Sequence, residues 1–300
     1  MARFSFWPHS GYHAHLGHTQ AATMDDYPFV LITGCSSGIG LAAAKALGDH
    51  GFTVIASARK ADDVAQLQQQ GLLAVQLDLA DTASIEQGAA EALELAGGRL
   101  YGLFNNGAYG QPGALEDLPT EALRAQFDTN LFGWHHLIRQ ILPTMLAARE
   151  GRIVQNSSVL GLVAMKYRGA YNASKFALEG YTDTLRLELE GSGVHISLIE
   201  PGPIDTRFRA NAHAAFVRHI DPAQSRHQGA YRQTLTRLEK EGATSGFTLP
   251  SDACIPPLLH ALQSKRPKHR YPVTFPTRLF AILRRLLPSS WLDRILSKSA

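Results

Sequence analysis

Tyr171 and Lys175 stand four residues apart in the segment AYNASK at residues 170–175, and these two side chains together can move a proton. In a helix they lie one turn apart on the same face. A phenol titrates near pH ~10 and an ammonium near ~10.4, so neither group alone suits acid–base chemistry at neutral pH. An ammonium beside a phenol favours the phenolate, so we expect Lys175 to lower the pKa of Tyr171 toward neutrality. The alternative is a surface Tyr/Lys pair on an amphipathic helix, which would be preferred for an isolated pair.

A glycine-rich turn stands between a strand-like run, FVLIT at residues 29–33, and the helix-forming residues 41–47. Glycines in this setting permit a tight turn, and the free N–H groups of the following helix can bind a pyrophosphate. The spacing, three residues and then one residue between glycines, differs from the usual G-x-G-x-x-G. The alternative is a glycine loop without a ligand. The residues of this turn that we expect to bind a cofactor are Gly34, Ser36, Ser37, Gly38, Ile39 and Gly40.

Taken together, these motifs resemble the single-domain short-chain dehydrogenase/reductase family. The resemblance covers residues 28–206, with weaker similarity to the end of the chain. Within the family it is strongest to the bacterial NADP-dependent aldehyde reductases and more distant to the retinol and 17β-hydroxysteroid dehydrogenases, a placement that residues 270–274 and 284–288 support. The matching segments are residues 33–40, Asn105 to Ala108, Asn130, Ser157 and Ser158, Tyr171 and Lys175, and residues 201–206.

The resemblance implies a catalytic set of Asn130, Ser158, Tyr171 and Lys175. Ser158, which lies 171 − 158 = 13 residues before the tyrosine, would hold the carbonyl oxygen as charge builds on it. Asn130 would anchor a water that relays protons from Lys175, and Lys175 would also bind the nicotinamide ribose. Ser157 is the neighbouring alternative to Ser158, and we expect it to make a hydrogen bond at the end of a strand.

The cofactor preference depends on the residues after the second predicted strand. An NAD enzyme carries an acidic residue about 20 positions past the glycines, whereas this chain has Ala58 followed by Arg59. A guanidinium can bind a 2′-phosphate, so we expect NADP(H); the alternative is an arginine with a structural role. By family analogy Asp78 would meet the adenine and Thr206 the carboxamide. The remaining residues that the resemblance places at the cofactor are Leu79, Asn105, Tyr171, Lys175, Pro201, Gly202 and Ile204.

One motif departs from the family pattern. The family usually has Asn-Asn-Ala-Gly where this chain has Asn105-Asn106-Gly107-Ala108. If the fourth position needs a positive φ, Ala108 costs ~1 kcal/mol or more, which would weaken cofactor binding locally.

The fold class that the sequence predicts is α/β, with a doubly wound parallel sheet of Rossmann type. Six strand-like runs alternate with helical segments between residues 29 and 199, and such alternation implies parallel strands joined by crossover helices. All the motifs fall at the carboxyl ends of strands, where ligands bind in such sheets. We expect a single catalytic domain over 27–275. The predicted strands are 29–33, 53–57, 73–77, 101–105, 151–156 and 194–199; the longer predicted helices are 121–148 and 171–190.

Three segments fall outside this alternation. Residues 1–26 carry His9, His13, His15 and His18 and predict a disordered leader rather than a metal site, because ligand spacing is missing; Met24 is an alternative start. Residues 207–250 are polar without a clean period, as expected of a mobile substrate lid.

Residues 276–300 predict two amphipathic helices. Arginines stand opposite an apolar stripe on the first helix, Pro288 ends it, and Ser290 with Asp293 predicts the start of the second. Packing of these helices on the enzyme's own core, or over the substrate pocket, is the preferred interpretation. Peripheral contact with a membrane through 276–296 is the alternative. The apolar stripe consists of Leu279, Ile282, Leu283, Leu286 and Leu287.

The net charge and the cysteine count exclude some classes of protein. A formal charge of +3 is too small and too evenly spread for nucleic-acid binding, and two cysteines make a disulfide framework implausible. A reducing cytoplasm fits the two cysteines. The family resemblance implies an enzyme without a metal that reduces an apolar aldehyde, ketone, retinoid-like or steroid-like carbonyl, or oxidises the alcohol. A homo-oligomer is left open. A catalytically silent dinucleotide sensor is the main alternative; a nucleotide-sugar epimerase is disfavoured because its G-x-x-G-x-x-G motif and sugar domain are missing.

Overall fold

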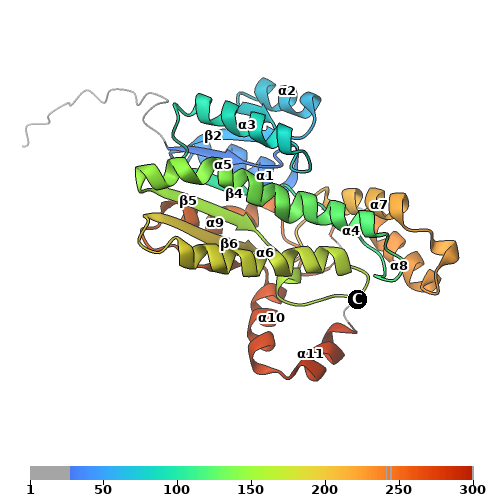
Figure 1. Ribbon diagram of the computed structural model, residues 1–300. Coiled ribbons are helices and arrows are strands. Elements are labelled where there is room, and N and C mark those ends of the chain that lie inside the picture. Colours follow the sequence, from blue (N-terminus) through green and yellow to red (C-terminus); the bar gives the residue numbers. More distant parts are fainter. Residues whose placement is uncertain (1–27, 241, 244, 299–300) are drawn as a thin grey trace, which may run out of the picture.

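The computed structural model describes residues 28–240, 242–243 and 245–298, so the predicted leader at 1–26 lies outside the described residues. A seven-stranded sheet forms the centre of the molecule, with strand order β3-β2-β1-β4-β5-β6-β7 and every neighbouring pair parallel (Figure 1). The prediction of a parallel, doubly wound sheet is therefore confirmed. The strands are β1 Phe29–Ile32, β2 Thr53–Ala58, β3 Leu73–Gln76, β4 Gly102–Asn105, β5 Gly151–Asn156, β6 Val194–Glu200 and β7 Arg270–Pro272.

Helices cover both faces of this sheet. One apolar cluster joins the sheet to α1, α2 and α9, and a second joins it to α3, α5 and α6. The inner strands are buried on both faces, which explains why they appear in the sequence as continuous apolar runs. The helices are α1 Gly38–Gly48, α2 Ala61–Gln69, α3 Thr82–Leu95, α4 Thr120–Phe127, α5 Gly133–Ala148, α6 Gly169–Glu188, α7 Phe208–His219, α8 Gln228–Glu239, α9 Ile255–Gln263, α10 Phe275–Leu286 and α11 Ser289–Leu296.

The long helix predicted over 121–148 is present, but its type of helical turn changes part of the way along. A π-helical turn, Asp128–Phe132, joins α4 to α5, so the chain stays helical from residue 120 to residue 148. A π turn inserts one extra residue and redirects the side chains around it, and such turns recur at functional sites. Asn130 lies within this turn.

The predicted lid contains more regular structure than its sequence indicates. Most of residues 207–250 form α7 and α8, two helices that the polar sequence without a clean period did not indicate. Each of these helices buries only two side chains, Ala212 and Phe216 in α7 and Tyr231 and Leu238 in α8. Helices that bury so little leave a weak apolar period in the sequence.

The chain after the lid also differs in detail from the prediction. Strand β7 is three residues long and was not predicted. Helix α11 begins at Ser289 rather than at Ser290, and the residue before it, Pro288, makes no side-chain cap, so the predicted capping signal was wrong. None of the described helices is long and apolar enough to cross a bilayer.

Candidate active site

The glycine turn after β1 packs directly against the chain that leaves β4. Gly34 has φ +70°, and a Cβ on it would lie 2.6 Å from the Cα of Gly107. A Cβ on Gly40 would lie 2.3 Å from the carbonyl oxygen of Gly34. Because neither position can hold a larger residue without moving backbone, the glycines bring the N-terminus of α1 close to the sheet edge.

A polar network locks these two segments together. The Oγ1 of buried Thr33 accepts hydrogen bonds from the backbone N–H groups of Asn106, at 2.8 Å, and Gly107, at 2.9 Å. The Asn106 amide donates to the Thr33 carbonyl at 3.0 Å and accepts from the Asn156 amide at 2.8 Å. Strands β1, β4 and β5 thus present their carboxyl ends as one rigid edge.

The Asn-Asn-Gly-Ala motif carries no backbone strain. Among the described non-glycine residues, only Arg149 and Tyr167 have positive φ, and neither Gly107 nor Ala108 adopts the left-handed region. The cost that we expected for Ala108 was therefore wrong. A Cβ on Gly107 would lie 3.1 Å from Leu79 Cδ1, so the alanine usual in the family would need only a small shift of that side chain.

Tyr171 and Lys175 occupy successive turns of α6 and both are buried. The Lys175 Nζ donates to the Asn156 carbonyl at 2.7 Å, lies 4.4 Å from the Trp134 ring centroid and lies 5.7 Å from that of Tyr171. The Tyr171 ring meets the Phe208 ring edge-on, with the centroids 5.2 Å apart. The pair is therefore not on a solvated helix face, which was the alternative interpretation.

The protonation states differ from those expected. Burial raises the pKa of Tyr171 to about 12, against lowering effects of the Ser158 hydroxyl and the Arg168 guanidinium, so the predicted shift toward neutrality was wrong for this structure. Burial also lowers the pKa of Lys175 to about 7. In this structure burial is the largest influence on the pKa of both groups.

Asn130 lies close to this pair and is completely buried. Its Nδ2 donates to the Tyr109 carbonyl at 2.9 Å and contacts Ser174 Oγ at 3.4 Å, and its Oδ1 accepts from the Tyr109 N–H at 3.3 Å. The Ser174 hydroxyl in turn donates to the Tyr171 carbonyl at 2.9 Å. The π turn thus connects the loop after β4 to α6.

The two adjacent serines have different surroundings. Ser158 follows β5, and its Oγ accepts the Leu160 N–H at 3.1 Å. Ser157 donates its hydroxyl proton to the carboxylate of Glu179, which is also paired with Arg270. Ser157 therefore belongs to an ion-pair cluster with Glu179 and Arg270, which is a structural role. Ser158, by contrast, lowers the pKa of Tyr171 through its hydroxyl.

The residues expected to meet the adenosine half of a cofactor lie after β2 and β3. Arg59 is exposed, and within the described part of the chain its guanidinium has no hydrogen-bond or ion-pair partner; its carbonyl accepts Gln76 Nε2 at 3.0 Å. Asp78 is half-buried, and its carboxylate accepts the Ala80 N–H at 3.0 Å. Leu79 is buried beside Gly107.

The nicotinamide half would meet the ends of β4 and β6. Asn105 is buried: its Nδ2 donates to Gln155 Oε1 at 2.9 Å, while its Oδ1 lacks a partner among the described residues. Gly202 packs so tightly that a Cβ on it would lie 2.1 Å from Thr274 Oγ1, and Pro201 accepts the Val159 N–H at 2.8 Å. The structure therefore brings the predicted residues of 201–206 to the same edge.

A hollow of about 450 Å³ lies between the start of α1 and the chain after β6. It is lined on one side by Ser37, Gly38 and Lys45, and on the other by residues 205–207. Gly38 has φ +60°, and a Cβ there would lie 3.0 Å from the methyl group of Thr206. The hollow adjoins the free N–H groups of α1, where an anion is favoured, but it does not extend to Tyr171.

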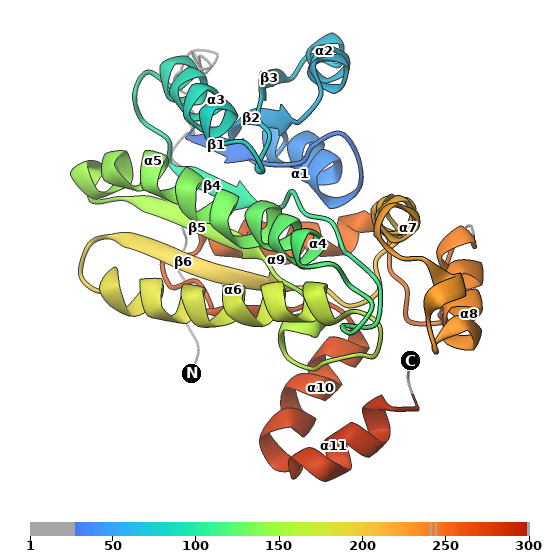
Figure 2. The same ribbon diagram turned by 45° about the vertical axis from the view of Figure 1, so that its right-hand side comes forward.

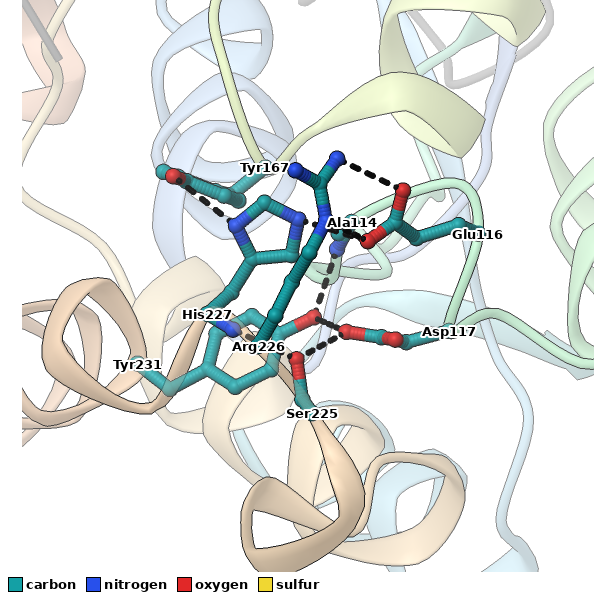
Figure 3. Close-up of polar contacts among 8 residues, drawn as sticks. All are labelled: Ala114, Glu116, Asp117, Tyr167, Ser225, Arg226, His227 and Tyr231. Carbon is teal, nitrogen blue, oxygen red and sulfur yellow. Dashed lines mark hydrogen bonds and ion pairs between the residues drawn. The ribbon is translucent and has the colours of Figure 1, made fainter.

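The lid is attached to the body by a polar cluster between α8 and the loop after β4 (Figure 3). Tyr231 is fully buried; its hydroxyl donates to the Asp117 carboxylate and accepts the Ala114 N–H at 2.9 Å. The same carboxylate accepts the Ser225 hydroxyl at 2.5 Å. This cluster fixes α8 against the loop after β4.

A second carboxylate extends the same cluster toward solvent. Glu116 accepts two hydrogen bonds from Arg226, at 2.5 and 2.9 Å, and one from His227 Nε2 at 2.9 Å (Figure 3). The other ring nitrogen of His227 lies 3.4 Å from the hydroxyl of Tyr167. The backbone of Tyr167 has a positive φ of +59°. These ionic contacts are largely solvent-exposed.

Two residues at the site were missed from the sequence. The charge of Arg168, the residue before α6, lowers the pKa of Tyr171. Phe208, at the start of α7, packs edge-on against the Tyr171 ring. An arginine three residues before the tyrosine could have been noticed from helical spacing. Phe208 had no such signal, because only the folding of the lid brings it there. Among the described residues, no group of three or more His, Cys, Asp or Glu could hold a metal ion.

Comparisons with known proteins agree with this arrangement. The family model described as short chain dehydrogenase matches residues 28–215. The oxidoreductase YbbO of Escherichia coli K12 is 43% identical, over 89% of this chain and 93% of its own. The 3-ketodihydrosphingosine reductase of Bacteroides thetaiotaomicron is 34% identical, over 71% of this chain and 76% of its own. A short chain dehydrogenase/reductase from Burkholderia phymatum, solved in complex with NAD, is 27% identical with a TM-score of 0.71, covering 88% of this chain and 94% of that one.

Proposed function

Since the chain belongs to the short-chain dehydrogenase/reductase family and is an oxidoreductase of that family, we propose that it is an NADP(H)-dependent reductase of apolar aldehydes or ketones. The observation that carries the proposal is that Tyr171, Lys175 and Ser158 lie together at the end of β5, which hydrogen bonds of Asn156 and Asn106 connect to the glycine turn. Buried catalytic groups beside a phosphate-binding turn suit hydride transfer to a carbonyl, and a sensor without catalysis has no need of them.

The residues at the sheet edge fit a dinucleotide. The glycine turn offers the free N–H groups of α1 to a pyrophosphate, and the unsatisfied Oδ1 of Asn105 offers an acceptor at the end of β4. When bound, the reduced nicotinamide supplies the hydride that the carbonyl carbon accepts. The preference for the phosphorylated cofactor is supported by Arg59, exposed and free of partners in the described structure, and by Ala58 where an acidic residue would repel a phosphate.

The chain's own residues move the proton. With its pKa near 12, Tyr171 is fully protonated at neutral pH and can donate its hydroxyl proton to the carbonyl oxygen. The Ser158 hydroxyl holds that oxygen as negative charge develops. Lys175, with its pKa near 7, can return a proton to the phenolate. Asn130 holds the loop after β4 in place, and solvent along this loop would reprotonate Lys175.

An apolar substrate is supported by the lid. Phe208 covers the ring of Tyr171, and a Cβ on Gly110 would lie 2.7 Å from the Phe208 ring. The relative that is named as a 3-ketodihydrosphingosine reductase has a name that denotes a long-chain ketone, which favours the same class here.

The test measures, by absorbance at 340 nm, the rate at which NADPH or NADH is oxidised in the presence of aliphatic aldehydes, retinoids or steroid ketones. We expect turnover with at least one apolar class and a preference of about tenfold or more for NADPH. Tight NADPH binding without turnover of any panel member would favour the silent sensor instead.

A further inference from the structure

The two C-terminal helices leave large apolar side chains at the surface. Leu286 is 72% exposed, Trp291 61% and Ile282 56%. Phe275, Leu279, Ile282 and Leu286 follow one another at spacings of four, three and four residues, so they form one stripe along α10. Within the described part of this tail, the buried side chains are limited to Thr277 in α10 and Leu296 in α11.

This stripe is not the face by which α10 is attached to the body. On the attached face, Thr277 is buried beside Thr274, and the Arg284 guanidinium lies 5.1 Å from the Phe176 ring centroid of α6. Arg284 is about half a turn away from the stripe. Of the predicted stripe, Ile282 and Leu286 are more than half exposed and so do not pack on the enzyme's own core, whereas Leu283 and Leu287 are half-buried. Figure 2 shows α10 and α11 extending away from the sheet and its covering helices.

The apolar surface continues onto the C-terminal end of the lid, where Phe247 lies two residues before Leu249, which pairs with Ile204. Phe247 stacks on Phe275, with ring centroids 5.6 Å apart and planes inclined by 23°. Both rings remain more than half exposed. Phe247 and α10 thus share one apolar surface, although about 30 residues of chain separate Phe247 from Phe275.

Basic side chains accompany this surface. Residues 275–298 hold five basic side chains and one acidic one, whereas the whole chain has a formal charge of only +3. Arg278 and Arg285 lie seven residues apart, along one flank of the stripe rather than opposite it as predicted, and Arg285 also lines the hollow between α6 and α10. Arg294 and Lys298 are exposed on and just after α11. Positive charge is therefore concentrated where the apolar residues are.

We propose that Phe247, α10 and α11 form a membrane-docking surface that binds an anionic bilayer. Apolar side chains beside basic ones, with a tryptophan among them, are the features of helices that lie in the bilayer interface. Each arginine or lysine near an anionic surface strengthens such binding. A second copy of this chain would bring the same positive charges face to face, so the charge pattern favours lipid over self-association.

The test is co-sedimentation of the full-length protein with vesicles of phosphatidylcholine alone or mixed with phosphatidylglycerol. We expect binding to the anionic vesicles at low salt and its loss as salt is raised, because salt screens surface charge. Leu286→Ser/Trp291→Ser should weaken binding at least about tenfold, through lost apolar contact. The matched control is Leu187→Ser/Val217→Ser, two side chains of similar exposure elsewhere, which should bind as wild type does.

A charge-reversal pair tests the electrostatic part without touching apolar residues. Arg285→Glu/Arg294→Glu should reduce binding to anionic vesicles, while Arg124→Glu/Arg139→Glu, on exposed positions of α4 and α5, should not. Circular dichroism and NADPH turnover on a water-soluble aldehyde separate this result from misfolding and from failure of the proposed function. A protein that stays in the supernatant, that binds neutral vesicles equally well, or that forms a dimer which Leu286→Ser/Trp291→Ser dissociates, would overturn the proposal.

Discussion

The catalytic edge of the sheet and the lid above it are held by different kinds of contact. At the edge, Asn130 and Lys175 are fully buried and hydrogen-bond to backbone carbonyls of the loop after β4 and of β5. The lid is attached largely through side chains, and its outer ion pair between Glu116 and Arg226 is solvent-exposed. The candidate catalytic residues are thus held in the core, while the segment 207–250 is held both by the buried Tyr231 and by an ion pair that water can replace.

This difference has an energetic consequence. A buried polar group that loses its partner costs its full desolvation, about 1–3 kcal/mol, whereas exposed ion pairs contribute little. Changes at the edge should therefore affect turnover, stability or cofactor binding strongly. Changes in the lid should affect substrate access and local opening.

The largest effect is expected for Tyr171→Phe. Loss of the proton donor should reduce kcat by about 10²- to 10⁴-fold, while the Kd for NADPH changes little, because the phenol hydroxyl acts in the transition state. Steady-state rates and a fluorescence titration of NADPH measure the two quantities. The control is Tyr181→Phe, a change further along α6 that should retain activity. Turnover of Tyr171→Phe within tenfold of wild type would contradict the mechanism.

Lys175 should make the ligand-free protein more stable as pH rises from 7 to 9. Its pKa is lowered on folding, so in this range the unfolded state binds the extra proton, and stability increases with pH by up to ~1.4 kcal/mol per unit. Below pH 7 both the folded and the unfolded state bind this proton, so Lys175 no longer makes the free energy of unfolding depend on pH. Lys175→Met should remove the slope in urea-unfolding experiments at each pH, with Lys45→Met, a more exposed lysine on α1, as the control. An unchanged slope would mean that Lys175 stays charged when folded.

Arg59→Ala should weaken NADPH binding by about 1–3 kcal/mol and leave NADH binding nearly unchanged, because only the phosphorylated cofactor loses a charge-assisted contact. Titration of both cofactors measures this. Lys60→Ala, the exposed neighbour, is the control. Equal losses for NADPH and NADH would show that Arg59 supports the structure rather than choosing the cofactor.

The smallest effects are expected in the lid. Tyr231→Phe removes the hydroxyl that joins Asp117 to Ala114 and should loosen α8 by about 1 kcal/mol, seen as faster amide exchange in α8 and an altered KM. Arg226→Gln, in the exposed ion pair, should change amide exchange less than Tyr231→Phe does. A large fall in kcat for either variant would break the division between edge and lid.

Strong local patterns explain the successful predictions. The strands were found because buried parallel strands are continuous apolar runs, and the spacing of Tyr171 and Lys175 placed both on one helix face. The lid helices were missed because they bury two side chains each, and β7 because three residues hold no period. The membrane alternative for the tail remains a proposal, although the exposure of its stripe is now observed.

The sequence by itself determined the sheet, the glycine turn and the candidate catalytic side chains, since these depend on residue type and short spacing. Only the tertiary structure decided their protonation, because burial raises the pKa of Tyr171 and lowers that of Lys175, and burial depends on every element packed around α6. It also decided that Phe208 covers the tyrosine and that the stripe of α10 faces outward. Both depend on how the chain after β6 returns to the body, which no local pattern encodes.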